Sequence, residues 1–228
     1  MVDIFDEVDE ELRAEKAQKL FMRYSGVIGA VALAIVGAAG GWQGWQWWQA
    51  RQDAAAATAF LAAAASVETT PSADAAARIA QVAAFDAVAA ASPEGYRTLA
   101  RLRAAALRAE AGDIPGAAAL WDQVAGDADA DPLLRDLASL LWAQRQIDQG
   151  DPARVEGRLK PLTDPGNAWR SLAQEQLALL DLRQGRTAEA QAMFRKLSQD
   201  VTAPTGVRSR ATPLLSRDGD GVGGMTRP

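Results

Sequence analysis

The sequence predicts an all-α fold: a single N-terminal transmembrane helix followed by an α-solenoid of helical hairpins. Three observations support this prediction. Hydrophobic residues make up 49% of the 228-residue chain, and alanine supplies much of that share, which favours helix over sheet. No charged residue occurs between Tyr24 and Ala50. Beyond that stretch, three segments align without gaps around Gly112, Gly150 and Gly185, at a spacing typical of helical repeats.

Composition excludes several functions. The chain has no cysteine and no histidine, so it lacks thiolate and imidazole nucleophiles, imidazole bases and zinc sites built from these residues. Its formal charge of −5 offers no basic surface to nucleic acid. No pair of carboxylates stands isolated in an apolar pattern that would raise a pKa for acid–base work. We therefore expect no enzymatic activity, no metal, no cofactor, no small-molecule substrate and no nucleic-acid partner.

The uncharged stretch is long enough to cross a bilayer. Roughly 20 helical residues span a hydrocarbon layer of about 30 Å, and the residues from Ser25 to about Trp45 supply them. We assign residues 24–48 to a transmembrane signal-anchor helix and residues 1–23 to a cytoplasmic segment. Tryptophan favours the membrane boundary, because its ring is apolar and its N–H can reach water. Four tryptophans are therefore predicted membrane-interface residues: Trp42, Trp45, Trp47 and Trp48.

Basic residues predict the orientation of this helix. Four of them closely precede it, whereas Arg51 stands alone after it, so the N-terminus should be cytoplasmic. Two alternatives stay open. The tryptophans could form a soluble core cluster, although the glutamines between them argue against this. The segment could also be a cleaved signal peptide, although the leader is long and acidic and the apolar stretch exceeds the usual length.

The three aligned segments share a pattern of small and large residues. Each has alanine seven residues before its glycine, alanine or valine five after it and a large apolar residue nine after it. Antiparallel helices approach closely only where small residues face each other. We therefore expect two alanine pairs to meet between paired helices: Ala105 with Ala117, and Ala178 with Ala190.

Turn residues predict where these helices begin and end. The three glycines should end the first helix of each pair in a left-handed conformation, and Asp131 should cap the next helix ahead of Pro132. The remaining chain divides by composition. We assign residues 49–97 to a capping hairpin broken near Thr69, 98–202 to three repeats, 203–216 to a short closing helix broken near Pro213, and 217–228 to a disordered tail.

This pattern resembles the tetratricopeptide repeat in its glycine and its two small positions. The resemblance covers roughly Thr98 to Asp200. The sequence departs from that repeat at two positions of the first helix that are usually bulky, and this predicts irregular packing between repeats. The residues at these positions are Arg101, Ser139 and Gln174 at one, and Arg108, Gln146 and Asp181 at the other.

In a tetratricopeptide stack the first helices line a concave face, and the alignment predicts a partner-binding groove there. Its residues are Leu99, Leu102, Ala106, Leu137, Leu140, Gln144, Ile147, Leu172, Glu175, Leu179 and Leu182. This face is apolar, and exposed apolar patches of that size usually meet a partner. It lacks the Lys or Arg that would clamp a peptide carboxylate. In the alternative interpretation, residues 53–91 fold back and fill the groove.

Taken together, the early span, the tryptophans after it and the repeats ending WRSLAQEQLALLDLRQGRTAEAQAMFRKLSQD resemble the ancillary SecYEG translocon subunit (YfgM-like) family. The resemblance covers most of residues 1–210. It implies a single-pass protein of the bacterial inner membrane, with periplasmic repeats that associate with translocon subunits and periplasmic chaperones. Relatives of this kind also include coordinators of cell division and envelope assembly, which is the alternative function.

Overall fold

We describe a computed structural model of the chain, which covers residues 4–69 and 75–216. Side chains are described from Met22 onward, except those of Ser25, Ile28 and Ser216. Every regular element within these ranges is helical, so the all-α prediction is confirmed for them. The chain divides into two compact units, residues 1–54 and 55–228, which are treated separately below.

Helix α1 (Ile4–Thr69) is 66 residues long and continues past every boundary that the sequence analysis placed within it. The chain contains no proline before Pro71, so nothing removes a backbone hydrogen bond until that point. Within the first unit, every described side chain from Met22 to Ala54 is exposed. Over the described residues, no helix combines the length and the apolar character that a membrane crossing requires. The side chains of Ser25 and Ile28, two residues of the predicted span, are not among those described.

The second unit begins with a helical pair. The last turns of α1 pack with α2 (Ala75–Ala91) and α3 (Glu94–Glu110) around a cluster that contains Phe60 and Phe85. The two rings meet edge to face, 5.5 Å apart, and Gln81 Nε2 donates a hydrogen bond to the Ser66 carbonyl at 3.1 Å. Residues 55–69 and 75–91 therefore pack against the first repeat helix.

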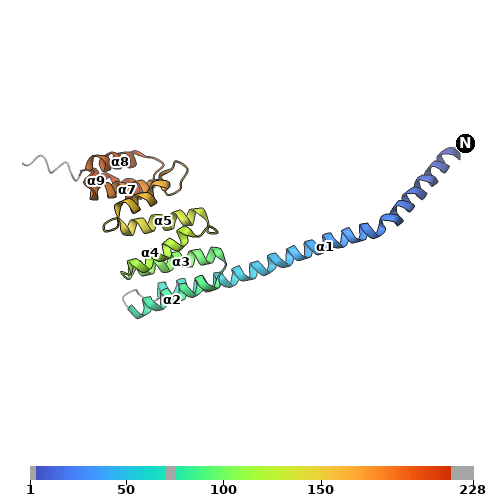
Figure 1. The fold of residues 1–228 in the computed structure, drawn as a ribbon, viewed down its shortest axis with the longest axis horizontal. Coiled ribbons are helices and arrows are strands. Elements are labelled where there is room, and N and C mark those ends of the chain that lie inside the picture. The colour runs from blue at the N-terminus through green and yellow to red at the C-terminus, as the bar shows by residue number, and fades with distance from the viewer. Residues whose placement is uncertain (1–3, 70–74, 217–228) are drawn as a thin grey trace, which may run out of the picture. The chain divides into compact units, whose positions relative to one another are not determined.

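Helical pairs continue along the stack (Figure 1), where α3, α5 and α7 follow one another. The remaining helices are α4 (Ile114–Gly126), α5 (Pro132–Gln146), α6 (Pro152–Leu159), the short 3₁₀ helix η1 (Lys160–Thr163), α7 (Arg170–Arg183), α8 (Thr187–Gln199) and α9 (Thr205–Ser216). Ala105 and Ala117 are buried in one core cluster, and Ala178 and Ala190 in another. The prediction that these alanines lie between paired helices is confirmed.

Two of the three predicted glycine turns are confirmed. Gly112 and Gly185 have φ angles of +85° and +76°, a conformation that glycine adopts at little cost. The prediction was wrong for Gly150, which does not have a positive φ. Its requirement is steric instead, because a Cβ there would lie 2.7 Å from both the Cβ and the carbonyl oxygen of Gln146.

Two helices contain or end beside a proline. Helix α6 ends early at Leu159, because Pro161 cannot donate the next helical hydrogen bond, and the chain continues as η1. Leu162 in η1 is nevertheless buried. Pro213 does not break the closing helix, contrary to expectation, and lies within α9. It stands near the end of that helix, where few residues remain to be disturbed.

Polar residues at the positions that are usually bulky form ion pairs and hydrogen bonds with α2 and with the turns next to α4 and α8. Arg101 pairs with Asp127 at 3.1 Å, and Arg108 pairs with Asp86 of α2 at 2.8 Å. In the third repeat, Asp181 accepts a hydrogen bond from Arg186 Nε at 2.9 Å. These contacts replace the apolar packing that a regular tetratricopeptide repeat has at the same positions.

Candidate functional site

A groove of about 560 Å³ lies between α5, α7 and α9. Two of its walls are stripes with the same helical spacing, since residues at i, i+3, i+4 and i+7 share one helix face. Helix α5 contributes Leu137, Leu140, Leu141 and Gln144, and α7 contributes Leu172, Glu175, Gln176 and Leu179. Trp169, Arg210 and Leu214 complete the lining. The groove is therefore mainly apolar, with four polar side chains.

Capping contacts fix the end of this groove where α5 begins. Asp131 accepts a hydrogen bond from the Leu133 amide at 2.7 Å and caps α5, which confirms the predicted cap. The Trp169 indole N–H then donates to the Leu133 carbonyl at 3.0 Å. Asn167 ties the loop before α7 to α5, because its Nδ2 donates to Asp136 at 2.7 Å. The tryptophan ring is thus held in place as a wall of the groove.

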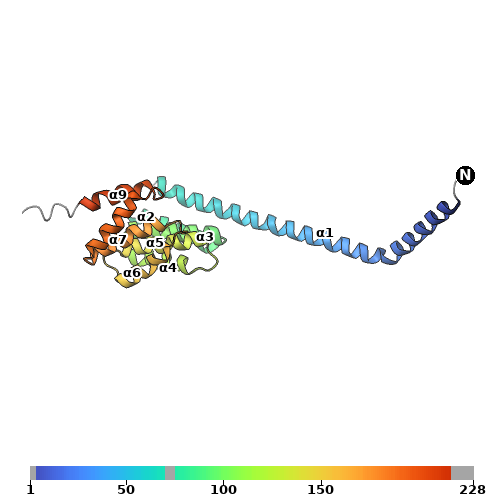
Figure 2. The same cartoon turned by 90° about the horizontal axis from the view of Figure 1, so that it is seen from above.

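Helix α9 supplies the third wall. It packs on α7 and α8 (Figures 1 and 2) through Val207 and Ala211, which are buried in the cluster around Phe194. The next face of the same helix carries Arg210 and Leu214, four residues apart, into the groove lining. The groove is therefore bounded by the helix that ends the stack.

Glu175 is the one acidic side chain in the groove lining, and Arg210 neutralises it. Arg210 donates from Nε and Nη2 to the two carboxylate oxygens at 2.6 and 2.7 Å. The Glu175 side chain is 4% exposed, whereas that of Arg210 is 56% exposed. Its hydrogen bonds to Glu175 raise the pKa of the Arg210 guanidinium above its ordinary value. Arg210 therefore stays positively charged, and the formal charges of the two side chains in the groove lining cancel.

Two glutamines give the groove hydrogen-bonding capacity. Gln144 is exposed on the α5 wall. Gln176 on the α7 wall is 8% exposed, and its Oε1 has no hydrogen-bond partner among the described residues. Buried polar atoms are usually paired, but this oxygen is enclosed within the wall and has almost no accessible surface.

Six of the eleven residues predicted for the groove line it together: Leu137, Leu140, Gln144, Leu172, Glu175 and Leu179. The other five lie elsewhere. Leu102 and Ile147 belong to the core between repeats, and Leu182 packs on the cluster beneath α9. Leu99 is exposed and Ala106 is half-buried on α3, which contributes nothing to this groove.

In the alternative interpretation, residues 53–91 fold back and fill the groove. The structure does not place them there. None of the described residues in that range lines it, and those in the second unit pack against α3 instead. Sequence reasoning missed five lining residues: Leu141, Trp169, Gln176, Arg210 and Leu214. Leu141 and Gln176 are the i+4 neighbours of predicted residues and could have been found by completing the stripe. Nothing in the repeat pattern pointed to α9.

The four predicted membrane-interface tryptophans all lie in the first unit and are exposed. The Trp45 and Trp48 rings are 5.3 Å apart, and the Arg51 guanidinium lies 4.1 Å from the centre of the Trp47 ring. Arg51 thus covers one aromatic face through a cation–π contact. No described residue outside α1 contacts these rings in an aromatic or cation–π pair.

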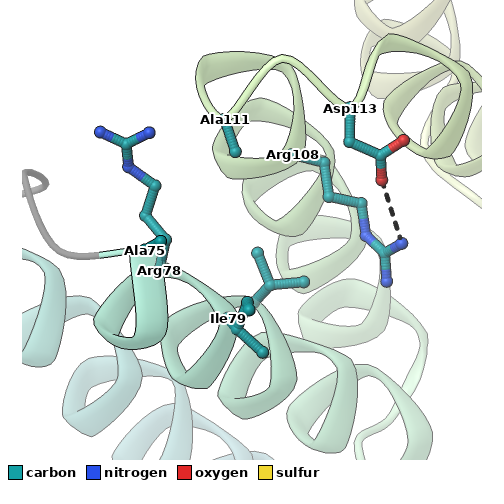
Figure 3. A pocket seen from close by; sticks show the side chains of 7 residues that line it. Ala75, Arg78, Ile79, Arg108, Ala111 and Asp113 are labelled. Atoms are coloured by element: carbon teal, nitrogen blue, oxygen red, sulfur yellow. Dashed lines mark ion pairs between the residues drawn. The ribbon is translucent and has the colours of Figure 1, made fainter.

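A second cavity of about 410 Å³ lies where α2 meets the turn between α3 and α4. Figure 3 shows that its two arginines, Arg78 and Arg108, do not converge on a common point. Arg108 is held by Asp86 at 2.8 Å and by Asp113 at 3.6 Å. The cavity rim ends at Ala75, beside residues outside the described ranges. The groove is therefore the better candidate site.

The fold defines the chain as a helical-repeat protein. A scan of protein families matches residues 18–192 to the tetratricopeptide repeat-like domain, and the chain belongs to this family. Domains of this kind are typically non-catalytic modules for protein interaction. Searches of curated proteins and of solved structures each gave no significant match.

Proposed function

We propose that the chain is a membrane-anchored scaffold that holds a protein partner in the groove between α5, α7 and α9. The observation that carries this proposal is the groove itself: two leucine-rich stripes face an opening whose single carboxylate is already neutralised. An apolar groove with a few placed polar groups is the usual form of a ligand site. Its polar groups are amides and one ion pair, which suits recognition and offers no nucleophile or base.

Anchoring is supported by the surface of α1. Leu33, Ile35 and Val36 are all exposed. Leu33 and Val36, three residues apart, share one side of the helix, and Ile35 points to the other side. A helix that is apolar all round needs an apolar environment. We propose that residues 24–48 cross the bilayer, with the four tryptophans at its outer boundary and the N-terminus in the cytoplasm.

The resemblance to ancillary translocon subunits suggests the partners. On that basis we propose a bacterial inner-membrane location, with the repeats in the periplasm beside translocon subunits and periplasmic chaperones. The alternative is a scaffold for cell-division or envelope-assembly proteins, which would use the same groove. Both versions need the same anchor and the same surface, so only the identity of the partner separates them.

Site-specific photocrosslinking in cells tests this function. A photoreactive residue at Gln144 faces the groove, whereas one at Lys196 lies exposed on α8, outside it. We expect defined crosslinked products from position 144 only. Translocon subunits or chaperones among them support the first version, and division or wall-synthesis proteins support the second. Identical products from both positions would contradict a role for the groove, and protease access to the repeats from the cytoplasmic side only would contradict the orientation.

A further inference from the structure

Helix α9 has little to keep it helical when it is not docked on the stack. Half of its 12 residues are glycine, proline, threonine or serine, which are poor helix formers. Isolated helices of about this length are only marginally stable, even when they are rich in alanine. Two of its described side chains, Val207 and Ala211, are buried. The helical state of α9 therefore depends on its contacts with α7 and α8.

The repeats do not depend on α9 for their main core. The core cluster around Trp121 and Leu140 contains no described residue of α9. No other described helix follows α9, and residues 200–204 join it to α8. Terminal elements with few buried contacts open locally, at a lower free energy than the whole domain. Undocking of α9 is therefore a local event that leaves the rest of the stack folded.

At the groove, α9 meets α7 through an ion pair. The Glu175 side chain is 4% exposed, and both of its carboxylate oxygens accept hydrogen bonds from Arg210, whose side chain is 56% exposed. Packing alone does not require such a pair, because replacing a buried ion pair by apolar residues is often neutral or stabilising. If α9 undocks, Arg210 and Leu214 leave the groove lining with it. The Glu175 carboxylate then faces the groove without its cation.

We propose that α9 is an autoinhibitory lid. In its docked state it closes one side of the groove, with Arg210 bound to Glu175. In its undocked state it opens that side and leaves Glu175 to bind a Lys or Arg of the partner, which takes the position of the Arg210 guanidinium. This inference rests on the proposed function, because it describes how the same groove is opened. The docked lid lowers the apparent affinity for the partner, since only chains with α9 undocked can bind it.

Hydrogen exchange of the full chain, measured by mass spectrometry, tests the lid without a partner. We expect the amides of α9 to exchange at least about tenfold faster than those of α8. Arg210→Met should speed exchange in α9 by a further factor of about ten, because it weakens the docked state alone, and should leave α3 and α5 unchanged. Arg195→Met, at an exposed position of α8, is the matched control and should change neither.

Capture of the partner in cells tests the competition between α9 and the partner. The readout is the yield of crosslinked product from a photoreactive residue at Gln144. Arg210→Met should raise this yield several-fold, because it opens the lid. Adding Glu175→Gln to Arg210→Met should lower the yield again, because the lid is already open and the carboxylate that receives the partner's cation is now lost. A fixed wall predicts the opposite first result, a lower yield with Arg210→Met.

Faster exchange in α9, together with a yield that Arg210→Met raises and the added Glu175→Gln lowers, supports the inference. Exchange in α9 as slow as in α8, equal acceleration of α3 and α5 by Arg210→Met, or a lower yield with Arg210→Met would overturn it. A double variant that captures as much partner as Arg210→Met would overturn the role of Glu175. Absence of defined products from position 144 in every chain, wild type included, would contradict the proposed function instead, and the exchange measurement then decides whether α9 opens.

Discussion

Arg210 of α9 binds both carboxylate oxygens of Glu175 on α7, at 2.6 and 2.7 Å. This fork-shaped contact joins the helix that ends the stack to the first helix of the third repeat, at the wall of the groove. A guanidinium matches a carboxylate in this geometry with two parallel hydrogen bonds. The pair therefore contributes both to the stability of α9 and to the neutrality of the groove.

Removing the two partners of this pair should have unequal effects. Arg210→Met leaves a buried carboxylate unpaired, and we expect it to lower the free energy of unfolding by about 2–3 kcal/mol. That is less than the roughly 3–5 kcal/mol typical when a fully buried pair is broken, because the arginine is 56% exposed and solvent screens the interaction. Glu175→Gln keeps an acceptor for Arg210 and should cost about 1 kcal/mol. Urea unfolding of the full chain measures both values.

The double variant Glu175→Gln with Arg210→Met is the control for this pair. Its loss should be smaller than the sum of the two single losses, because the unpaired charge is then absent. Additive losses would show that the two side chains do not interact. Arg195→Met, at an exposed position of α8, should have little effect.

The close approach of α7 and α8 predicts sensitivity to side-chain volume. Ala190 is fully buried, and Ala190→Leu should destabilise the chain by about 1–3 kcal/mol through overpacking. Ala192 lies exposed on the same helix, so Ala192→Leu is a matched control and should be nearly neutral. Thermal unfolding monitored by circular dichroism compares the two. Equal tolerance of leucine at both sites would contradict the packing described here.

The glycine turns predict different responses to the same substitutions. Gly112 has a φ of +85° and open space around it, so its constraint is the backbone conformation. Gly112→Ala should cost about 1 kcal/mol, and Gly112→Asn less, because asparagine tolerates the left-handed region. Gly150 is limited by contact with Gln146, so alanine and asparagine should be equally unfavourable there. Asparagine as harmful as alanine at position 112 would contradict this distinction.

Asp200 predicts a dependence of stability on pH. The Thr202 hydroxyl and amide donate hydrogen bonds to it at 2.6 and 2.8 Å, and Arg170 lies 3.1 Å away. These contacts, with the threonine hydroxyl first, lower the pKa of Asp200 below its ordinary value of 3.8. The carboxylate therefore stabilises the fold above that pH, and the contribution disappears as the pH falls through the lowered pKa.

Comparison with Asp200→Asn at several pH values measures this contribution. The wild-type chain should be the more stable of the two at about pH 6, and the difference should shrink toward about pH 3. Asp148→Asn, in the turn after α5, controls for the removal of one carboxylate. A difference that grows as the pH falls would contradict the sign of the effect.

Small residues and glycines predicted the hairpins because their spacing reflects local helix geometry. Ala105, Ala117, Ala178 and Ala190 lie where the aligned pattern placed them. The aligned pattern did not predict where α6 ends. Pro161 ends this helix, although the segment around it aligns well with the other two repeats. At Gly150, a steric contact with one side chain replaces the backbone requirement, and no sequence pattern distinguishes these causes.

The candidate groove was partly predictable for the same reason. Equivalent positions in the first helices of successive repeats share a face, so the alignment of the repeats correctly predicted four lining residues: Leu137, Leu140, Leu172 and Leu179. It could not give Arg210 or Leu214, because α9 is a single helix outside the repeat and its docking depends on tertiary contacts with α7 and α8. The prediction that α3 residues line the groove was wrong, because this groove begins at the second repeat.

The central claim is that the groove between α5, α7 and α9 holds the protein partner, and retention of that partner by groove variants tests it most directly. The measurement is the amount of the partner, identified by crosslinking at Gln144, that copurifies with Leu179→Asp and with Leu61→Asp. Leu61 is exposed and lies outside the groove. We predict that Leu179→Asp loses the partner while the chain keeps its helical content, and that Leu61→Asp retains it. Full retention by a folded Leu179→Asp chain would contradict the account.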